Sequence, residues 1–180
     1  GGMVASMKTN PQRVPAAALA VLTLAGVAAP ARAETRFLAY DAADRVTQAL
    51  TRGVTLEIRR GLLGGVSVRR IISTTARGSA RIDYGGPDAV RRALPQGSDE
   101  TTIYTVPSEG DGRGLSRALC PGSDQAFLVL GRVRAGRPLT VHAVGRWADG
   151  TMRHCVTLEY SYRGEWALPP PAPNGAPDTR

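Results

Sequence analysis

The fold is decided by three neighbouring runs of sequence, QAFLVLGRVR (125–134), RPLTVHAVGRW (137–147) and TMRHCVTLEYSYR (151–163). An Ala-Gly pair at 135–136 and an Asp-Gly pair at 149–150 separate them, and both pairs favour tight hairpin turns. In the third run, apolar residues at 156, 158, 160 and 162 alternate with polar ones, which is typical of a half-buried strand. The pattern therefore predicts an antiparallel three-stranded meander. Its first strand is apolar on both faces and is expected to be central.

The residues before this meander predict further strands and a few helices. Val54–Arg59 alternates apolar and polar residues, and other strands are expected at 34–40 (an edge strand), 66–74, 79–84 and 101–106. Asp41 is a candidate N-cap for a helix over 42–52, and short helices are expected at 88–94 and 115–119. The expected fold is α+β, with an antiparallel sheet of about six strands, one N-terminal helix and one or two short helices. An all-β sandwich is the alternative.

Residues 7–33 have the organisation of a cleavable signal peptide. Lys8 and Arg13 precede an apolar run at 16–29, and Ala31-Arg32-Ala33 has the small-x-small pattern of a cleavage site. Residues 1–6 precede the expected start at Met7 and are interpreted as a remnant of cloning or as an overlong start. The sequence thus predicts a periplasmic or secreted protein, with one globular domain at 34–167 and a Pro-rich disordered tail at 168–180. The apolar run is too short to span a bilayer, and no apolar segment of sufficient length follows Ala33. No transmembrane helix is therefore expected after signal removal.

The chain is strongly basic, and its charge indicates the chemistry of possible partners. Its 23 basic residues exceed its 15 acidic ones, and the formal net charge of +8 falls to about +5 once the leader is removed. No lysine follows the leader, and GC-rich codon usage is a sufficient explanation. Arginine nevertheless grips phosphate and carboxylate groups bidentately. We therefore expect an anionic lipid, lipopolysaccharide, a polysaccharide or an envelope protein as partner, whereas export argues against nucleic acid.

Four arginines of the meander are the candidate binding residues. Arg132 and Arg134 share one face of a strand, and Arg137 follows across a tight turn. Together with Arg146 they could form a basic patch, with ordinary solvated charge as the alternative interpretation.

The two cysteines, Cys120 and Cys155, are expected to form a disulfide in an oxidising compartment. Closing this loop should stabilise the fold by about 3–4 kcal/mol. A zinc site combining the cysteines with His142 and His154 is disfavoured, because residues 154 and 155 are consecutive in a strand and point to opposite faces. We therefore expect neither a metal nor another cofactor.

A catalytic alternative centres on Ser116, in the sequence Gly114-Leu-Ser-Arg-Ala118. This sequence loosely resembles a nucleophile elbow, but a glycine-rich acidic loop precedes it where the elbow needs a strand. His142 or His154 would have to act as the base, and neither has a carboxylate partner identifiable from sequence. A small envelope hydrolase using these residues is therefore a secondary hypothesis.

The absence of a convincing catalytic set favours a non-catalytic module. The leading hypothesis is an exported module that binds an anionic cell-envelope component or an envelope protein. The hydrolase and a structural accessory subunit of an envelope complex are the alternatives.

Overall fold

A computed structural model describes residues 33–73 and 79–170. Apart from Ala33, the predicted signal peptide lies outside the described residues, as do residues 171–180 of the predicted tail. Three helices and nine strands make up the described part: β1 (Glu34–Ala42), α2 (Arg45–Leu50), β2 (Val54–Arg60), β3 (Val66–Ser73), β4 (Ala80–Arg81), β5 (Asp83–Tyr84), α3 (Ala89–Arg92), β6 (Thr102–Val106), α4 (Asp111–Leu119), β7 (Gln125–Leu130), β8 (Leu139–Arg146) and β9 (Met152–Trp166).

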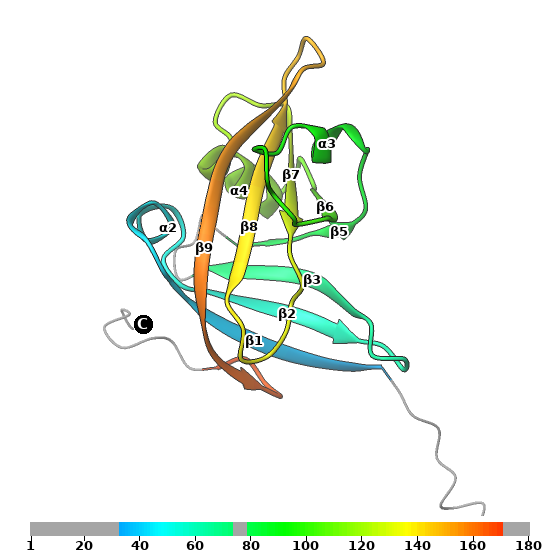
Figure 1. Ribbon diagram of the computed structural model, residues 1–180, viewed down its shortest axis with the longest axis vertical. Coiled ribbons are helices and arrows are strands. Elements are labelled where there is room, and N and C mark those ends of the chain that lie inside the picture. The colour runs from blue at the N-terminus through cyan, green and yellow to red at the C-terminus, as the bar shows by residue number, and fades with distance from the viewer. Residues whose placement is uncertain (1–32, 74–78, 171–180) are drawn as a thin grey trace, which may run out of the picture. The chain divides into compact units, whose positions relative to one another are not determined.

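The strands form one antiparallel sheet in the order β4-β3-β2-β1-β9-β8-β7-β6-β5. It is curled into a nearly closed, barrel-like shape (Figure 1). The predicted α+β fold with about six strands is therefore wrong: 47% of the described residues are in strands and 14% are in helices. A single curled sheet also differs from the two-sheet sandwich that was the alternative. The predicted meander is present as β7, β8 and β9, which pair consecutively.

The two shortest strands, β4 and β5, bring the two edges of the sheet together. The edge strands β4 and β5 are separated in the chain by one residue, Ile82, so opposite edges of the sheet are covalent neighbours. The Ile82 N–H donates to the carbonyl of Arg69, and the buried Tyr104 hydroxyl of β6 accepts from the Val68 N–H of β3 at 3.0 Å. These two hydrogen bonds join the sheet across its seam, where ladder pairing between strands is interrupted.

The concave face of the sheet encloses the main hydrophobic core. In β2, Val54, Leu56 and Ile58 are buried, as the alternation predicts, while the residues between them are partly exposed. In β7, all residues from Ala126 to Leu130 are buried, which confirms that this strand is central. Three tyrosines, Tyr40, Tyr104 and Tyr160, are the largest fully buried side chains of this core.

A second, smaller core lies on the outer face of the meander. Phe127 and Val129 of β7 and Val144 of β8 belong to it, together with Val90 of α3. Alternate residues of these strands face the main core, and the apolar residues between them face outward. The outward residues are covered by Val90 of α3. The segment that contains α3 therefore occupies the outer surface beside β7 and β8 (Figure 1).

The N-terminal region departs from the expected pattern in two ways. β1 lies between β2 and β9 and is not an edge strand. It also continues to Ala42, so the helix expected over 42–52 is limited to Arg45–Leu50, with Asp44 as its N-cap. In this helix the apolar Val46 is 49% exposed, whereas the polar Thr47 is buried and its hydroxyl accepts a hydrogen bond from the Glu159 N–H.

Candidate functional site: an arginine cleft beside a histidine cluster

A cleft of about 530 Å³ opens at one end of the sheet, between the β2–β3 hairpin and the segment that joins β7 to β8. Openings of this kind at the ends of β-barrels are common ligand sites. We call it the arginine cleft. Its lining residues are Gly64, Gly65, Val66, Thr101, Thr102, Tyr104, Leu130, Gly131, Arg132, Val133 and Arg134.

The lining of the arginine cleft is positively charged. Arg132 and Arg134 are exposed, and within residues 33–73 and 79–170 neither forms an ion pair with an acidic side chain. No lining residue is acidic. The hydroxyls of Thr101 and Thr102 add neutral hydrogen-bond donors. The cleft therefore offers two guanidinium groups that are free to bind an anion.

Tyr104 forms part of the cleft wall and of the seam of the sheet at once. Its hydroxyl accepts from the Val68 N–H and retains its own hydrogen for donation. Burial raises the pKa of Tyr104 above its ordinary value of 10.0, so the phenol stays protonated at neutral pH. This residue stiffens the wall against which a ligand would rest.

The four predicted binding arginines do not form one patch. Arg132 and Arg134 line the cleft, and Arg137 lies on the same segment, where its N–H donates to the carbonyl of Arg134. Arg146 is the last residue of β8, whereas the cleft lies near the start of that strand. Seven residue steps of strand separate the two ends, a span of about 24 Å. One bound group could contact the cleft arginines but not Arg146.

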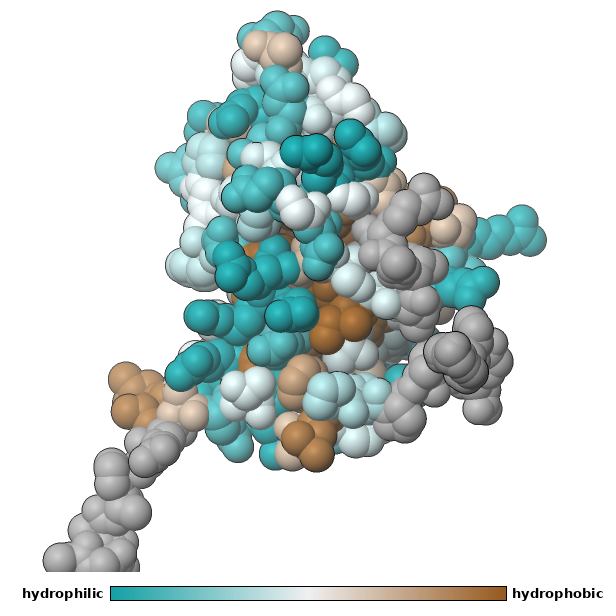
Figure 2. Space-filling view, turned by 180° about the vertical axis from the view of Figure 1, so that it is seen from behind, coloured by the Kyte–Doolittle hydropathy of each residue, from teal (hydrophilic) through white to brown (hydrophobic). Residues whose placement is uncertain are grey.

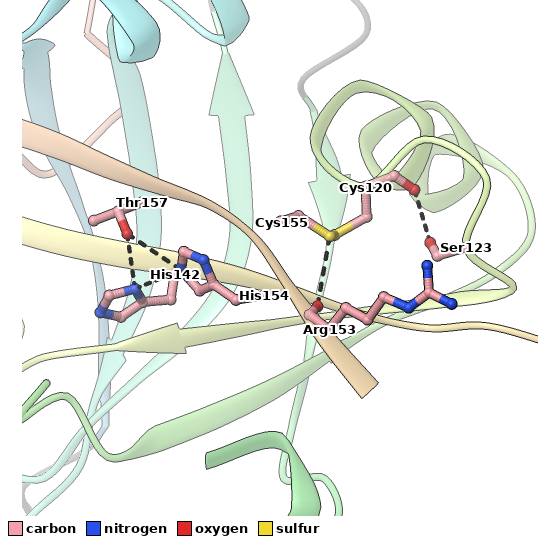
Figure 3. Close-up of a disulfide and its surroundings, with 7 residues drawn as sticks. All are labelled: Cys120, Ser123, His142, Arg153, His154, Cys155 and Thr157. Carbon is pink, nitrogen blue, oxygen red and sulfur yellow. Dashed lines mark hydrogen bonds between the residues drawn. A yellow bond between two sulfur atoms is a disulfide. The ribbon is translucent and has the colours of Figure 1, made fainter. Parts of the chain in front are cut away.

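The two histidines meet on the outer face of the meander. His142 in β8 is buried, and its Nδ1 lies 3.1 Å from His154 Nε2 and 3.1 Å from the Thr157 hydroxyl of β9 (Figure 3). The Thr157 hydroxyl is also 3.2 Å from His154 Nε2. On the other side of the ring, His142 Nε2 is 2.7 Å from Glu100 Oε1. These four residues are the histidine cluster.

Glu100 determines which ring nitrogen of His142 carries the hydrogen. A carboxylate only accepts hydrogen bonds, so the hydrogen of His142 is assigned to Nε2. Nδ1 of the neutral ring is then the acceptor for His154 or Thr157. The order Thr157, His142, Glu100 matches a hydroxyl, a base and an orienting carboxylate. Thr157, however, lies within a central strand, and none of the four residues lines the arginine cleft.

A β-bulge brings His154 onto the outer face. The register between β8 and β9 shifts between Ala143 and Val144, so that Ala143 pairs with Val156 while Val144 pairs with His154. Cys155 is the extra residue and packs against the main core, and His154 reaches the face of His142 and Thr157. Strict alternation places His154 with Val156 and Leu158, so the sequence does not predict this meeting.

The surroundings of His154 favour its neutral form. Partial burial lowers the pKa of His154 below its ordinary value of 6.5, and the neighbouring His142 lowers it further. At neutral pH His154 is therefore uncharged.

Two members of the histidine cluster, Glu100 and Thr157, were not predicted from the sequence. Thr157 pairs with His142 across the meander, so an accurate strand register would have found it. Glu100 lies 42 residues from His142 in a segment without regular structure, and no sequence signal connects them.

Ser116 is not brought to either histidine. It lies in α4, a helix that begins at Asp111 within the predicted loop and packs Leu115 and Leu119 into the main core. Its side chain lines a shallow depression of about 220 Å³ with Arg113, Arg117 and Ser123, among others, and neither histidine lines it. The Ser116 hydroxyl is buried without a hydrogen-bond partner among the described residues. The structure thus places neither histidine at this serine, and the acidic residue that lines the same depression is Asp124.

The predicted disulfide between Cys120 and Cys155 is present, with 5.4 Å between their Cα atoms (Figure 3). It joins the end of α4 to β9. Among the described residues, no group of three or more histidine, cysteine, aspartate and glutamate side chains is placed to hold a metal ion. Within the same part of the chain, no helix is long and apolar enough to cross a bilayer.

Comparisons with protein-family models, with curated proteins and with solved structures found no match to this chain.

Proposed function

We propose that the protein is an exported, non-catalytic module that binds an anionic component of the cell envelope in the arginine cleft. The observation that carries the proposal is a 530 Å³ opening lined by Arg132 and Arg134, with no acidic residue in its lining. Phosphate groups of lipids or lipopolysaccharide and the carboxylates of acidic polysaccharides share the required negative charge and the paired acceptor oxygens that a guanidinium group binds bidentately.

Export is supported by two independent features. Residues 7–33 match the pattern of a cleavable leader. The Cys120–Cys155 disulfide is a cross-link that persists in oxidising compartments such as the periplasm. An envelope component is therefore a partner that the module would meet.

The non-catalytic assignment follows from the distribution of reactive groups. Ser116 has no histidine at its hydroxyl, and the histidine cluster lies outside the lining of the arginine cleft. Binding and proton-transfer groups therefore do not converge on one pocket, as an active site requires.

The test uses inositol hexakisphosphate as a soluble polyphosphate probe. We expect binding at low salt that weakens steeply as salt is added, because exposed charges are screened within about 10 Å at 0.1 M ionic strength. The variant R132Q/R134Q should bind about tenfold more weakly or worse, since each lost guanidinium removes a charge-assisted hydrogen bond. The matched control R45Q/R146Q loses the same charge away from the cleft and should bind within about twofold of the unchanged protein.

Two results would count against the proposal. Absence of binding at low salt would remove the anionic ligand. Equal weakening in both double variants would show that net charge, and not the cleft, attracts the probe.

A further inference from the structure

The tip of the β2–β3 hairpin exposes two adjacent leucines. Leu63 is fully exposed and Leu62 is 63% exposed, whereas the leucines of the strands are buried. The hairpin projects from the sheet in Figure 1, and Figure 2 shows hydrophobic residues at the projecting tip at the lower left. Scattered single apolar residues are ordinary on protein surfaces, but an adjacent pair at a projecting tip is a feature that calls for a partner.

Backbone hydrogen bonds hold the tip in a defined conformation. The Gly61 N–H donates to the Gly65 carbonyl at 2.7 Å, and the Gly64 N–H donates to the Gly61 carbonyl at 3.1 Å. Gly64 has a φ of +89°, a conformation that glycine adopts without strain. The turn therefore presents the two leucines outward in a fixed way, and little order has to be gained when they are buried by a partner.

Unpaired positive charge lies beside the leucines. Gly64 and Gly65, which follow Leu63, form one wall of the arginine cleft, and Arg132 and Arg134 line the same cleft. Arg59 near the end of β2 is exposed and forms no ion pair within the described ranges 33–73 and 79–170. Arg60, in contrast, contacts Glu34 and Glu165 and is neutralised by them.

We propose that this end of the molecule docks on an anionic phospholipid bilayer, with Leu62 and Leu63 inserted among the acyl chains and Arg132 and Arg134 bound to lipid phosphates. The inference rests on the proposed function and names the source of the anion. Apolar side chains flanked by arginines complement a bilayer, where phosphates overlie hydrocarbon. A soluble polysaccharide offers the charges but no apolar layer for the leucines.

The proposal is tested by flotation with vesicles of phosphatidylcholine containing 30% phosphatidylglycerol. The variant L62S/L63S should partition about tenfold or more weakly than the unchanged protein, because two leucines lose their transfer into hydrocarbon. Its affinity for inositol hexakisphosphate should stay within twofold. Val46 of α2, which is 49% exposed at the end of β1 and β2 opposite the hairpin, provides the control: V46S should float like the unchanged protein.

A second measurement follows the tip itself. In L63W, the added tryptophan should shift its emission to shorter wavelength on vesicle binding and should be quenched by lipids brominated in their acyl chains. Difference spectra against the unchanged protein remove the contribution of Trp147 and Trp166.

The outcomes separate this inference from the proposed function. If L62S/L63S floats like the unchanged protein, or if the L63W emission is unaffected by brominated lipid, insertion of the hairpin is refuted, whereas phosphate binding in the cleft can still stand. Equal loss of vesicle and inositol hexakisphosphate binding in L62S/L63S would also refute it, because the leucines would then act on the cleft alone. If R132Q/R134Q retains both affinities, the proposed function and the inference fail together.

Discussion

The two ends of the barrel-like sheet are built differently. At the disulfide end, formed by α4, the start of β7 and residues 146–155, a cystine joins α4 to β9, and Leu115 and Leu119 fill the core. At the cleft end, formed by the β2–β3 hairpin and residues 130–138, glycines and exposed arginines surround an opening. The covalent cross-link thus lies at one end, and the other carries the charges and exposed leucines that a ligand can use.

The largest effect expected from this contrast is the loss of stability when the disulfide is removed. The variant C120A/C155A should lose about 3–4 kcal/mol of unfolding free energy, because the unfolded chain is no longer constrained by a 35-residue loop. Chemical denaturation of the oxidised and substituted proteins measures the difference. The affinity of the folded variant for inositol hexakisphosphate should be unchanged. A large loss of affinity with intact folding would show that the two ends are coupled.

A smaller effect is expected from adding one methyl group at each end. A Cβ at Gly112 in α4 would collide with the backbone carbonyl of Pro107, and G112A should therefore cost about 1–3 kcal/mol. A Cβ at Gly131 in the cleft would lie 3.3 Å from Cγ of Glu100, which would have to yield by only a few tenths of an ångström, so G131A should cost about 1 kcal/mol or less. Equal destabilisation of the two variants, measured by thermal unfolding, would contradict the contrast.

Much of this architecture follows from local sequence, and the remainder depends on contacts distant in the chain. The turn at 149–150, the alternation in 54–59 and the cystine were predictable because period-2 patterns, glycine turns and paired cysteines act locally. The tight turn expected at 135–136 was wrong, because β7 ends at Leu130 and β8 begins at Leu139, so that Arg132 and Arg134 lie in a longer connection and not in a strand. Closure of the sheet was not predictable, because β4 and β5 have two residues each and such short strands show no periodic pattern.

The candidate site was predictable only in part. Arg132 and Arg134 were identified from their charge and spacing, but the cleft between them and Gly64 depends on how the hairpin and the β7–β8 segment meet in space. Likewise, the β-bulge at Cys155, opposite Ala143 and Val144, turns the His154 side chain to the outer face of the sheet. A single extra residue in a strand has no sequence signature.

The smallest predicted effect concerns pH and arises at His154, beside the cystine of the disulfide end. Its pKa in the folded state is below the ordinary value, so the unfolded chain takes up a proton first as the pH falls. The corresponding stabilisation is complete above about pH 6.5 and is lost progressively as the pH falls toward the lower folded-state pKa. Unfolding free energies measured from pH 7.5 to 5 should fall less steeply in H154Q than in the unchanged protein. Partial exposure keeps the effect small, and a steeper fall in H154Q would contradict the assignment.

The central claim is that the opening at the cleft end, and not the overall positive charge, recognises the anion. It is tested most directly by the dissociation constants of R132Q/R134Q and R45Q/R146Q for inositol hexakisphosphate, measured side by side at low salt. The account predicts binding about tenfold weaker or worse in the first variant and almost unchanged binding in the second. Equal dissociation constants for the two variants would contradict it.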